Sequence, residues 1–168
     1  WKGEYENSNK HFQESLDRFQ KIGDMWEMGM TLTGLSYSYF YSSDYKRGID
    51  IGHQRLEISQ KMKDDFGIST AEDTLSRFHP EMGEFDKAEE WGIKSLALSE
   101  EKKNIFINCL ANIHLGYLNL ERGNPTDALK YLEEAKISNE ENRFLKDFVV
   151  VLYPYLAEAY LLQFLSEE

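Results

Sequence analysis

The sequence predicts an all-α chain of about eight helices stacked as a repeat, and three observations support this prediction. Turn-forming residues recur every forty residues, at Gly3, Ser43, Gly83 and Gly123. A fixed period in this range is typical of stacked repeat architectures. Only three prolines occur in 168 residues, and no segment shows the alternation of β-branched residues that favours a strand. We therefore expect residues 1–168 to form a single array of antiparallel helix pairs.

The best-defined turn lies within residues 115–135, LGYLNLERGNPTDALKYLEEA. Gly123 can adopt the left-handed conformation that ends a helix, Asn124 offers a capping oxygen, and Pro125 suits the first position of a helix. The apolar residues of the following helix are spaced by four and three, so they share one face. These residues are Ala128, Leu132 and Ala135.

The forty-residue register also relates positions within the helices. Leu35, Leu75 and Leu115 align before the turns. At other positions of the helices the aligned residues are small. Small residues let two helix backbones approach closely. The other aligned sets are Thr31, Ala71 and Ala111; Ser36, Ser76 and Gly116; and Ser8, Gly48, Ala88 and Ala128.

The turn and cap signals set the expected helix boundaries. Pro80 should tighten or kink the end of the fourth helix, because its ring clashes with the preceding turn. Pro154 predicts either a kink in the last helix or a break that starts a helix at that residue. The expected helices span residues 4–21, 24–42, 45–62, 65–81, 85–100, 104–122, 125–139 and 142–165.

Three glycines lie inside the second helices of the expected pairs, although each costs ~1 kcal/mol in helix propensity relative to alanine. We interpret them as space left for bulky side chains of the neighbouring helices. The alternative is that the glycines are merely tolerated. The glycines are Gly48, Gly52 and Gly92, and the expected bulky side chains are Tyr37, Tyr39 and Phe78.

The chain is acidic, with 30 Asp and Glu against 19 Lys and Arg and a net charge of −11. This charge disfavours nucleic acid and anionic membranes as partners and favours a neutral or basic one. Solubility is the alternative explanation of the acidity. The single cysteine, Cys109, excludes an internal disulfide framework and fits a reducing compartment, so we expect a cytoplasmic location.

Residues 148–165, FVVVLYPYLAEAYLLQFL, approach the length of a membrane-spanning helix. Glu158 lies near the middle, where a carboxylate is costly in lipid, so we expect no membrane span. As the last helix of an array, this segment would leave an apolar face open. We expect that face to be covered by self-association or by residues of a longer parent protein. The face includes Val149, Val150, Leu152, Leu156, Tyr160 and Phe164.

The Leu115-Gly116 pair, the turn glycine and the spacing of Ala128, Leu132 and Ala135 resemble the tetratricopeptide repeat. The resemblance covers essentially the whole chain. Its forty-residue period is similar to a long variant found in sensor regions of signal-transduction ATPases, cyclase-associated arrays and scaffold proteins. The resemblance implies a right-handed superhelix in which the first helix of each pair lines a concave groove.

Two features depart from that family. Its tyrosine position in the first helix is Tyr39 in one copy but His79 and Asn119 in others, and the period is longer than the usual one. Some family members clamp acidic chaperone tails through Lys, Asn and Arg in the first helices. Here only Arg77 faces the expected groove, so we do not expect a chaperone tail as the ligand.

Residues spaced by four on the expected groove side form columns across the repeats. Two tyrosines beside an arginine, with an aspartate one turn away, make a mixture that is enriched at binding surfaces. The alternative is that the tyrosines pack between helices and leave only their hydroxyls in water. The expected groove residues are Thr33, Tyr37, Tyr41, Asp73, Arg77, Ile113 and Tyr117.

No motif in the sequence predicts catalysis, a cofactor or a metal site. The histidines lack metal-ligand partners at helical spacing, and no glycine-rich phosphate loop is present. We expect a protein–protein interaction module that binds a peptide segment or a partner domain. The alternative is an effector- or peptide-sensing arm of a multidomain signalling regulator. The chain starts at Trp1 inside a repeat, so we expect it to be a piece of a longer protein.

Overall fold

The structure is a computed structural model that describes residues 2–142 and 149–166. Within these residues it contains eight α-helices, one short 3-10 helix and no strand, so the all-α prediction is confirmed. The helices are α1 (Lys2–Ile22), α2 (Met25–Tyr41), α3 (Tyr45–Met62), α4 (Asp65–Phe78), η1 (Pro80–Met82), α5 (Phe85–Glu101), α6 (Ile105–Glu121), α7 (Pro125–Asn142) and α8 (Val149–Ser166).

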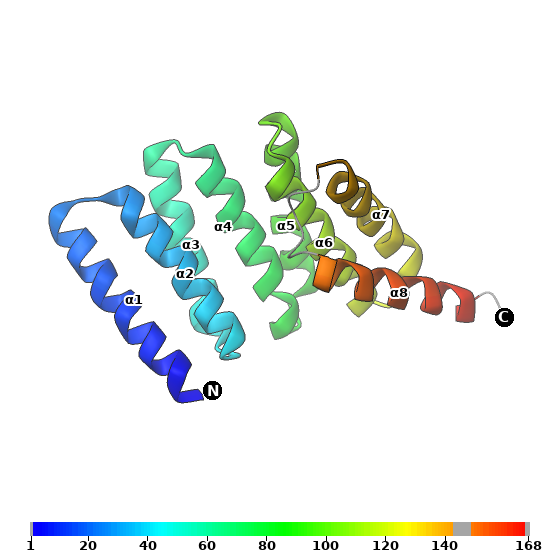
Figure 1. Cartoon of the computed structure of the whole chain (residues 1–168), viewed down its shortest axis with the longest axis horizontal. Helices are drawn as coiled ribbons and strands as arrows, with labels where there is room; N and C mark the ends of the chain where they lie inside the picture. The colour runs from blue at the N-terminus through cyan, green and yellow to red at the C-terminus, as the bar shows by residue number, and fades with distance from the viewer. Residues whose placement is uncertain (1, 143–148, 167–168) are drawn as a thin grey trace.

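Helices α1 to α7 follow one another along the row in chain order, and α8 lies across the C-terminal end of the row (Figure 1). Each α-helix packs against the next one along the chain. The even-numbered helices also contact one another directly, α2 with α4, α4 with α6 and α6 with α8. They therefore form one layer of the array, and the odd-numbered helices form the other.

The first six junctions between α-helices share one backbone geometry and recur every twenty residues. At each junction one residue is left-handed, with φ between 56° and 74°. The amide of the next residue donates a hydrogen bond to the carbonyl five positions earlier, which satisfies the end of the preceding helix. The left-handed residues are Gly23, Ser43, Lys63, Gly83, Lys103 and Gly123.

Each even-numbered helix from α4 onward buries a stripe of three residues, spaced by four and three, against the preceding odd-numbered helix. The step from the stripe of α4 to that of α6 is forty residues, whereas the step from α6 to α8 is forty-one. The register of α8 is therefore shifted by one residue. The stripes are Ala71, Leu75 and Phe78; Ala111, Leu115 and Leu118; and Leu152, Leu156 and Ala159.

The glycines inside the helices make room for large side chains, but only one predicted partner is correct. Gly48 faces the ring of Phe78, as predicted. At positions 52 and 92, the nearest side-chain carbons to an added Cβ would be leucine Cδ2 atoms of the buried stripes, at 2.8 Å and 2.6 Å. These leucines take the place predicted for Tyr37 and Tyr39, so that part of the prediction is wrong.

Some expected boundaries also need correction. Gly3 lies inside α1, so a turn at residue 3 is wrong. Pro80 begins the 3-10 helix directly after α4, which is the tightening predicted there. Pro154 lies inside α8, so a helix break at that residue is wrong. The early part of the expected helix 142–165 falls on residues 143–148, which lie outside the described residues.

Candidate binding cleft on the even-numbered helices

A cleft of ≈ 370 Å³ opens on the layer of even-numbered helices. Four helices that are distant in sequence, α2, α4, α6 and α8, contribute to its walls, together with η1. Most of the lining side chains are aromatic or aliphatic. The lining residues are Tyr37, Phe40, Tyr41, Arg77, Glu81, Leu110, Ile113, His114, Tyr117, Val151 and Tyr155.

Arg77 is held in the cleft by aromatic rings. Its guanidinium carbon lies 4.3 Å from the centre of the Phe40 ring and 4.6 Å from that of the Tyr37 ring. Such contacts are worth about 0.5–1 kcal/mol each at an exposed site. Among the described residues, no carboxylate lies within 4.0 Å of the Arg77 nitrogens. Within the part of the chain that the structure describes, Arg77 therefore brings to the cleft a positive charge without a close acidic partner.

Tyr117 forms another part of the wall. Its ring stacks on that of Tyr155 with 5.1 Å between centroids, and its hydroxyl donates to Glu81 Oε1 at 3.3 Å. Burial raises the pKa of Tyr117 above the usual tyrosine value, and the charges of Glu81 and Glu121 raise it further. Burial also raises the pKa of Tyr37 and of Tyr155. These hydroxyls stay protonated at neutral pH and can donate hydrogen bonds.

His114 connects the cleft to a buried carboxylate. Its Nδ1 lies 2.7 Å from Oδ1 of Asp73, which is only 6 % exposed. Asp73 does not line the cleft, so the sequence-based placement of this residue in the groove is wrong. Its contact orients the His114 ring, which does line the cleft.

The cleft brings together most of the groove residues expected from the sequence. Besides Asp73, Thr33 is missing from the lining, and its hydroxyl instead donates to the carbonyl of Gly29 at 3.1 Å. Of the two tyrosines predicted beside Arg77, Tyr37 is 41 % exposed, whereas Tyr117 is half-buried and stacked on Tyr155. The expected residues that line the cleft are Tyr37, Tyr41, Arg77, Ile113 and Tyr117.

Sequence reasoning missed several lining residues for two reasons. The predicted columns used only steps of four, whereas Phe40 and His114 lie three positions from predicted tyrosines on the same helix face. Val151 and Tyr155 come from α8, whose register is shifted by one residue and which a strict forty-residue count misplaces. A search at steps of both three and four would have found the first pair.

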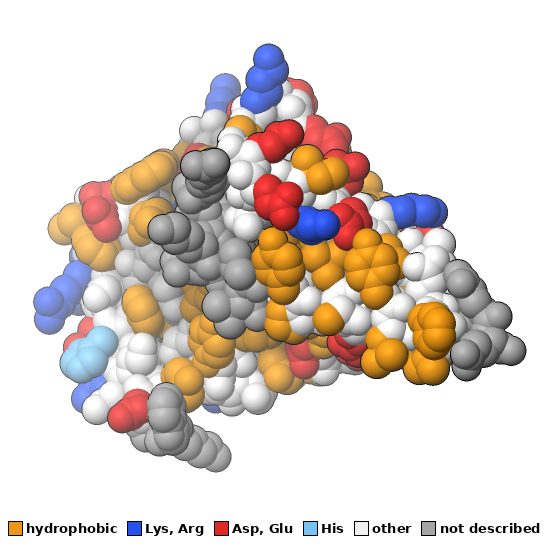
Figure 2. Space-filling view, turned by 45° about the vertical axis from the view of Figure 1, so that its right-hand side comes forward, with side chains coloured by type: hydrophobic (Ala, Val, Ile, Leu, Met, Phe, Trp, Pro, Cys, Tyr) orange, Lys and Arg blue, Asp and Glu red, His pale blue; other side chains and the backbone are white. Residues whose placement is uncertain are grey.

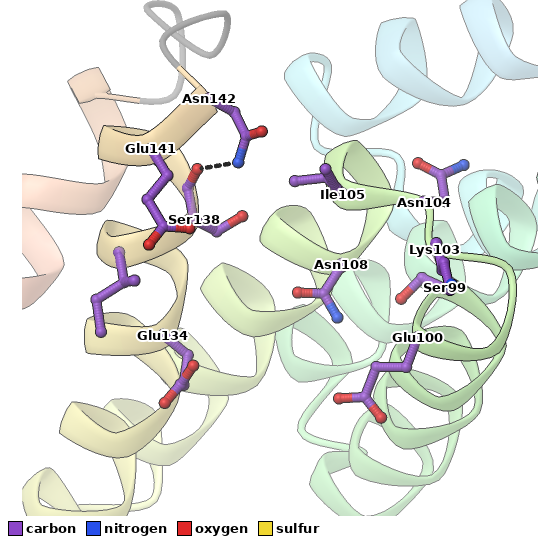
Figure 3. A pocket seen from close by; sticks show the side chains of 11 residues that line it. Ser99, Glu100, Lys103, Asn104, Ile105, Asn108, Glu134, Ser138, Glu141 and Asn142 are labelled. Atoms are coloured by element: carbon purple, nitrogen blue, oxygen red, sulfur yellow. Dashed lines mark hydrogen bonds between the residues drawn. The ribbon is translucent and has the colours of Figure 1, made fainter.

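A second hollow, of ≈ 270 Å³, lies between the α5–α6 junction and α7 (Figure 3). Its walls are largely polar, with the carboxylates of Glu100 and Glu134 on opposite sides. The side chain of Asn142 is turned onto its own helix and donates to the carbonyl of Ser138 at 2.8 Å. A ligand there would bury little apolar surface, so the aromatic cleft is the better candidate site.

The remaining findings concern metal binding, the single thiol and the length of the helices. In the part of the chain that the structure describes, no group of three or more His, Cys, Asp or Glu side chains is placed to hold a metal ion. Cys109 is fully buried, and burial raises the pKa of its thiol to about 11, so it remains a protonated core residue. None of the helices in residues 2–142 and 149–166 is long and apolar enough to cross a membrane.

No known family model matches the chain, and no curated protein is significantly similar to it. The internal repeat and the geometry of the cleft therefore carry the functional argument.

Proposed function

We propose that the chain is a protein–protein interaction module of the tetratricopeptide type, in which the aromatic cleft binds a peptide segment of a partner protein. In this proposal the array is a right-handed superhelix, and the even-numbered helices line its concave side. The observation that carries the proposal is Arg77, a cation without a close carboxylate among the described residues, set among aromatic side chains in a cleft built by four helices.

The composition of the cleft fits a peptide segment. Arginine and tyrosine are enriched among the residues that dominate binding energy at interfaces. Arg77 can hold a carboxylate or a backbone carbonyl of the segment through charge-assisted hydrogen bonds. Val151, which is 40 % exposed, offers apolar surface for one side chain of the segment. The net charge of −11 repels a strongly acidic segment, so the segment is neutral or basic overall, with one acceptor group for Arg77.

A small effector is the alternative ligand, and the size of the cleft favours it. A volume of ≈ 370 Å³ falls within the range of about 300–1,000 Å³ that small-molecule sites occupy. In that case the chain would be the effector-sensing arm of a signalling regulator.

The test selects ligands from a random peptide library, which requires no identified partner. Phage-displayed peptides are selected on the wild-type chain, and the dissociation constant of each enriched peptide is measured by fluorescence anisotropy. We expect Arg77→Gln to weaken binding about fivefold or more, because truncating an interface anchor costs roughly 1–3 kcal/mol.

The matched control is Phe66→Ala, which removes a 43 % exposed aromatic residue of α4 that does not line the cleft. Its binding should equal that of the wild type. Peptides whose affinity is insensitive to both Arg77→Gln and Tyr41→Ala would contradict the proposal. If no peptide is enriched, but a metabolite raises the thermal midpoint of the wild type and not of Arg77→Gln, the small-effector alternative is favoured.

A further inference from the structure

The later repeats carry an excess of carboxylates. Helix α7 alone has five acidic residues against two lysines. Figure 2 shows Asp and Glu side chains gathered above the hydrophobic side chains at the C-terminal end of the molecule. Carboxylates on a surface also serve solubility, so their number alone does not define a site. A polar cleft beside α7 adds buried acceptor groups to this negative charge.

This polar cleft, of ≈ 560 Å³, lies between α5 and α7, and α6 contributes part of its wall. It adjoins the hollow of Figure 3, because Glu100, Asn108 and Glu134 line both. Neither Glu100 nor Glu134 forms an ion pair with a described residue. Among the described lining residues the single cation is Lys130, whose side chain is 71 % exposed and bonded to Asp127 at 2.6 Å. The negative charge of the polar cleft is therefore only partly balanced.

Two buried asparagines of α6 also line the polar cleft. Asn112 and Asn119 are only 5 % and 6 % exposed. Their Nδ2 atoms donate to the carbonyls of Asn108 and Leu115, at 3.0 Å and 2.8 Å. Their side-chain oxygens have no hydrogen-bond donor among the described residues, and both oxygens keep some contact with solvent. Because buried amide groups are ordinarily hydrogen-bonded, these acceptors favour a ligand that donates hydrogen bonds.

The preceding repeat has its own cation at the equivalent place. Lys94 of α5 places its Nζ atom 4.3 Å from the centre of the Trp91 ring, which is a cation–π contact. The same ammonium group is bonded to Glu90 at 2.6 Å. Burial raises the pKa of Glu72 on α4, and the charge of Lys94 offsets part of that rise. In this repeat an aromatic ring and carboxyl groups therefore lie near an ammonium group that the chain itself supplies.

Forty residues later, the ring and the acceptor are retained but the ammonium group is not. Tyr131 takes the place of the tryptophan, and Asn112 takes the place of the α4 glutamate. Glu134 takes the place of Lys94, so a negative charge stands where the preceding repeat has a positive one. The comparison of the two repeats indicates that a cation from outside the chain would complete the polar cleft.

We propose that the polar cleft between α5 and α7 binds a primary ammonium group on an aliphatic stem, such as a lysine side chain or a polyamine carries. The ammonium group lies over Tyr131 and donates a hydrogen bond to the side-chain oxygen of Asn112. Glu100 and Glu134 attract its charge, and Leu96 offers apolar surface for the stem. This site is independent of the aromatic cleft, since no residue lines both.

The test titrates butylammonium chloride into the intact chain and follows the side-chain amide signals of Asn112 by NMR. We expect saturable shifts. The neutral isostere 1-butanol should bind about tenfold more weakly, because a charged donor forms a stronger hydrogen bond than a neutral one. Glu134→Lys should also weaken butylammonium binding about tenfold, because it supplies the ammonium group that Lys94 supplies in the preceding repeat.

The matched control is Glu57→Lys, which changes the net charge equally at an exposed position of α3. Its dissociation constant should stay within about twofold of the wild-type value, because salt screens distant surface charges. Equal affinity for butylammonium and 1-butanol would overturn the proposal. So would equal weakening by Glu134→Lys and Glu57→Lys, or Asn112 signals that do not shift.

A second variant tests the comparison between the repeats. Lys94→Ala removes the chain's own ammonium group, so the preceding repeat should gain a site for butylammonium. The indole N–H signal of Trp91 should then shift during the titration. It should not shift in the control Lys61→Ala, which removes an exposed lysine of α3 from a similar pair with a glutamate. An unchanged Trp91 signal in Lys94→Ala would contradict the proposal.

Two further probes distinguish the sources of the ammonium group. These are a lysine with acetylated and amidated backbone ends, and putrescine. Tighter binding of the blocked lysine assigns the polar cleft to a lysine side chain of a protein partner, whereas tighter binding of putrescine assigns it to a free polyamine. Either result supports the proposal, and failure of both probes to shift the Asn112 signals would overturn it.

Discussion

At the scale of single residues, the side chain of Glu72 in α4 is a carboxyl group whose protonated form is favoured by folding. Its Oε2 is buried without a hydrogen-bond partner in the described structure. Burial raises its pKa from 4.5 to about 7, although the charge of Lys94 lowers it in part. Between these two pKa values the unfolded chain releases the proton while the folded chain keeps it. The stabilising effect of the protonated group is therefore complete below about pH 4.5 and is lost as the pH rises through 7.

Glu72→Gln should consequently raise the thermal midpoint more at about pH 8 than at about pH 5, because the amide cannot ionise. Thermal unfolding of both proteins at the two pH values checks this. The control is Glu57→Gln, at an exposed carboxylate whose pKa is lowered by its hydrogen bond and ion pair with Lys61. A midpoint difference for Glu72→Gln that does not change with pH would show that Glu72 ionises freely in the folded chain.

At the scale of helices, the repeats keep their packing by exchanging large and small residues. Arg55 of α3 is 3 % exposed, and its guanidinium occupies the space left by the absent side chains of Gly29 and Gly67. Forty residues later the equivalents of Arg55 and Gly67 are Ser95 and Ile107, both fully buried. In the earlier repeat the large side chain therefore belongs to the odd-numbered helix, and in the later repeat it belongs to the even-numbered helix that follows. A repeat identified by residue type alone would overlook this compensation.

Ala128 of α7 tests the helix packing directly. It is fully buried in the cluster that joins α6, α7 and α8, and its carbonyl oxygen lies 3.4 Å from where a Cβ on Gly116 would be. We expect Ala128→Leu to lower the free energy of unfolding by about 1–3 kcal/mol through overpacking. Urea denaturation provides the measurement, and Ala97→Leu, at an exposed position of α5, is the control. Equal midpoints for the two variants would mean that α6 and α7 do not pack as described.

At the scale of the whole molecule, the sequence predicts the fold better than the site. The forty-residue period and the turn signals predicted the helices well, because glycine and proline constrain the backbone locally. The intermediate left-handed residues at Lys63 and Lys103 were not identified, because lysine gives no conformational signal. An acidic or amide residue follows every left-handed residue at twenty-residue steps, from Asp24 to Asn124, and this pattern could have shown them.

The cleft was harder to predict because it depends on contacts between distant helices. A forty-residue count aligned Tyr37, Arg77 and Tyr117 correctly, since α2, α4 and α6 keep one register. The same count could not place Tyr155, because α8 is shifted by one residue. This shift becomes visible only when the buried residues of α8 are known. The forty-residue count also could not show that Asp73 contacts His114, because this contact depends on how the side chains of α4 and α6 pack together.

The central claim is that the aromatic cleft binds a ligand and is not merely a packed surface. The most direct measurement is the dissociation constant of a selected peptide together with the thermal midpoint, for Tyr41→Ala and Tyr117→Ala. Tyr41 is 63 % exposed, so its loss should weaken binding by about 1–3 kcal/mol and leave the midpoint nearly unchanged. Loss of Tyr117 should raise the dissociation constant and also lower the midpoint, because its ring stacks on Tyr155. Lowered midpoints with unaltered affinity in both variants would contradict the claim.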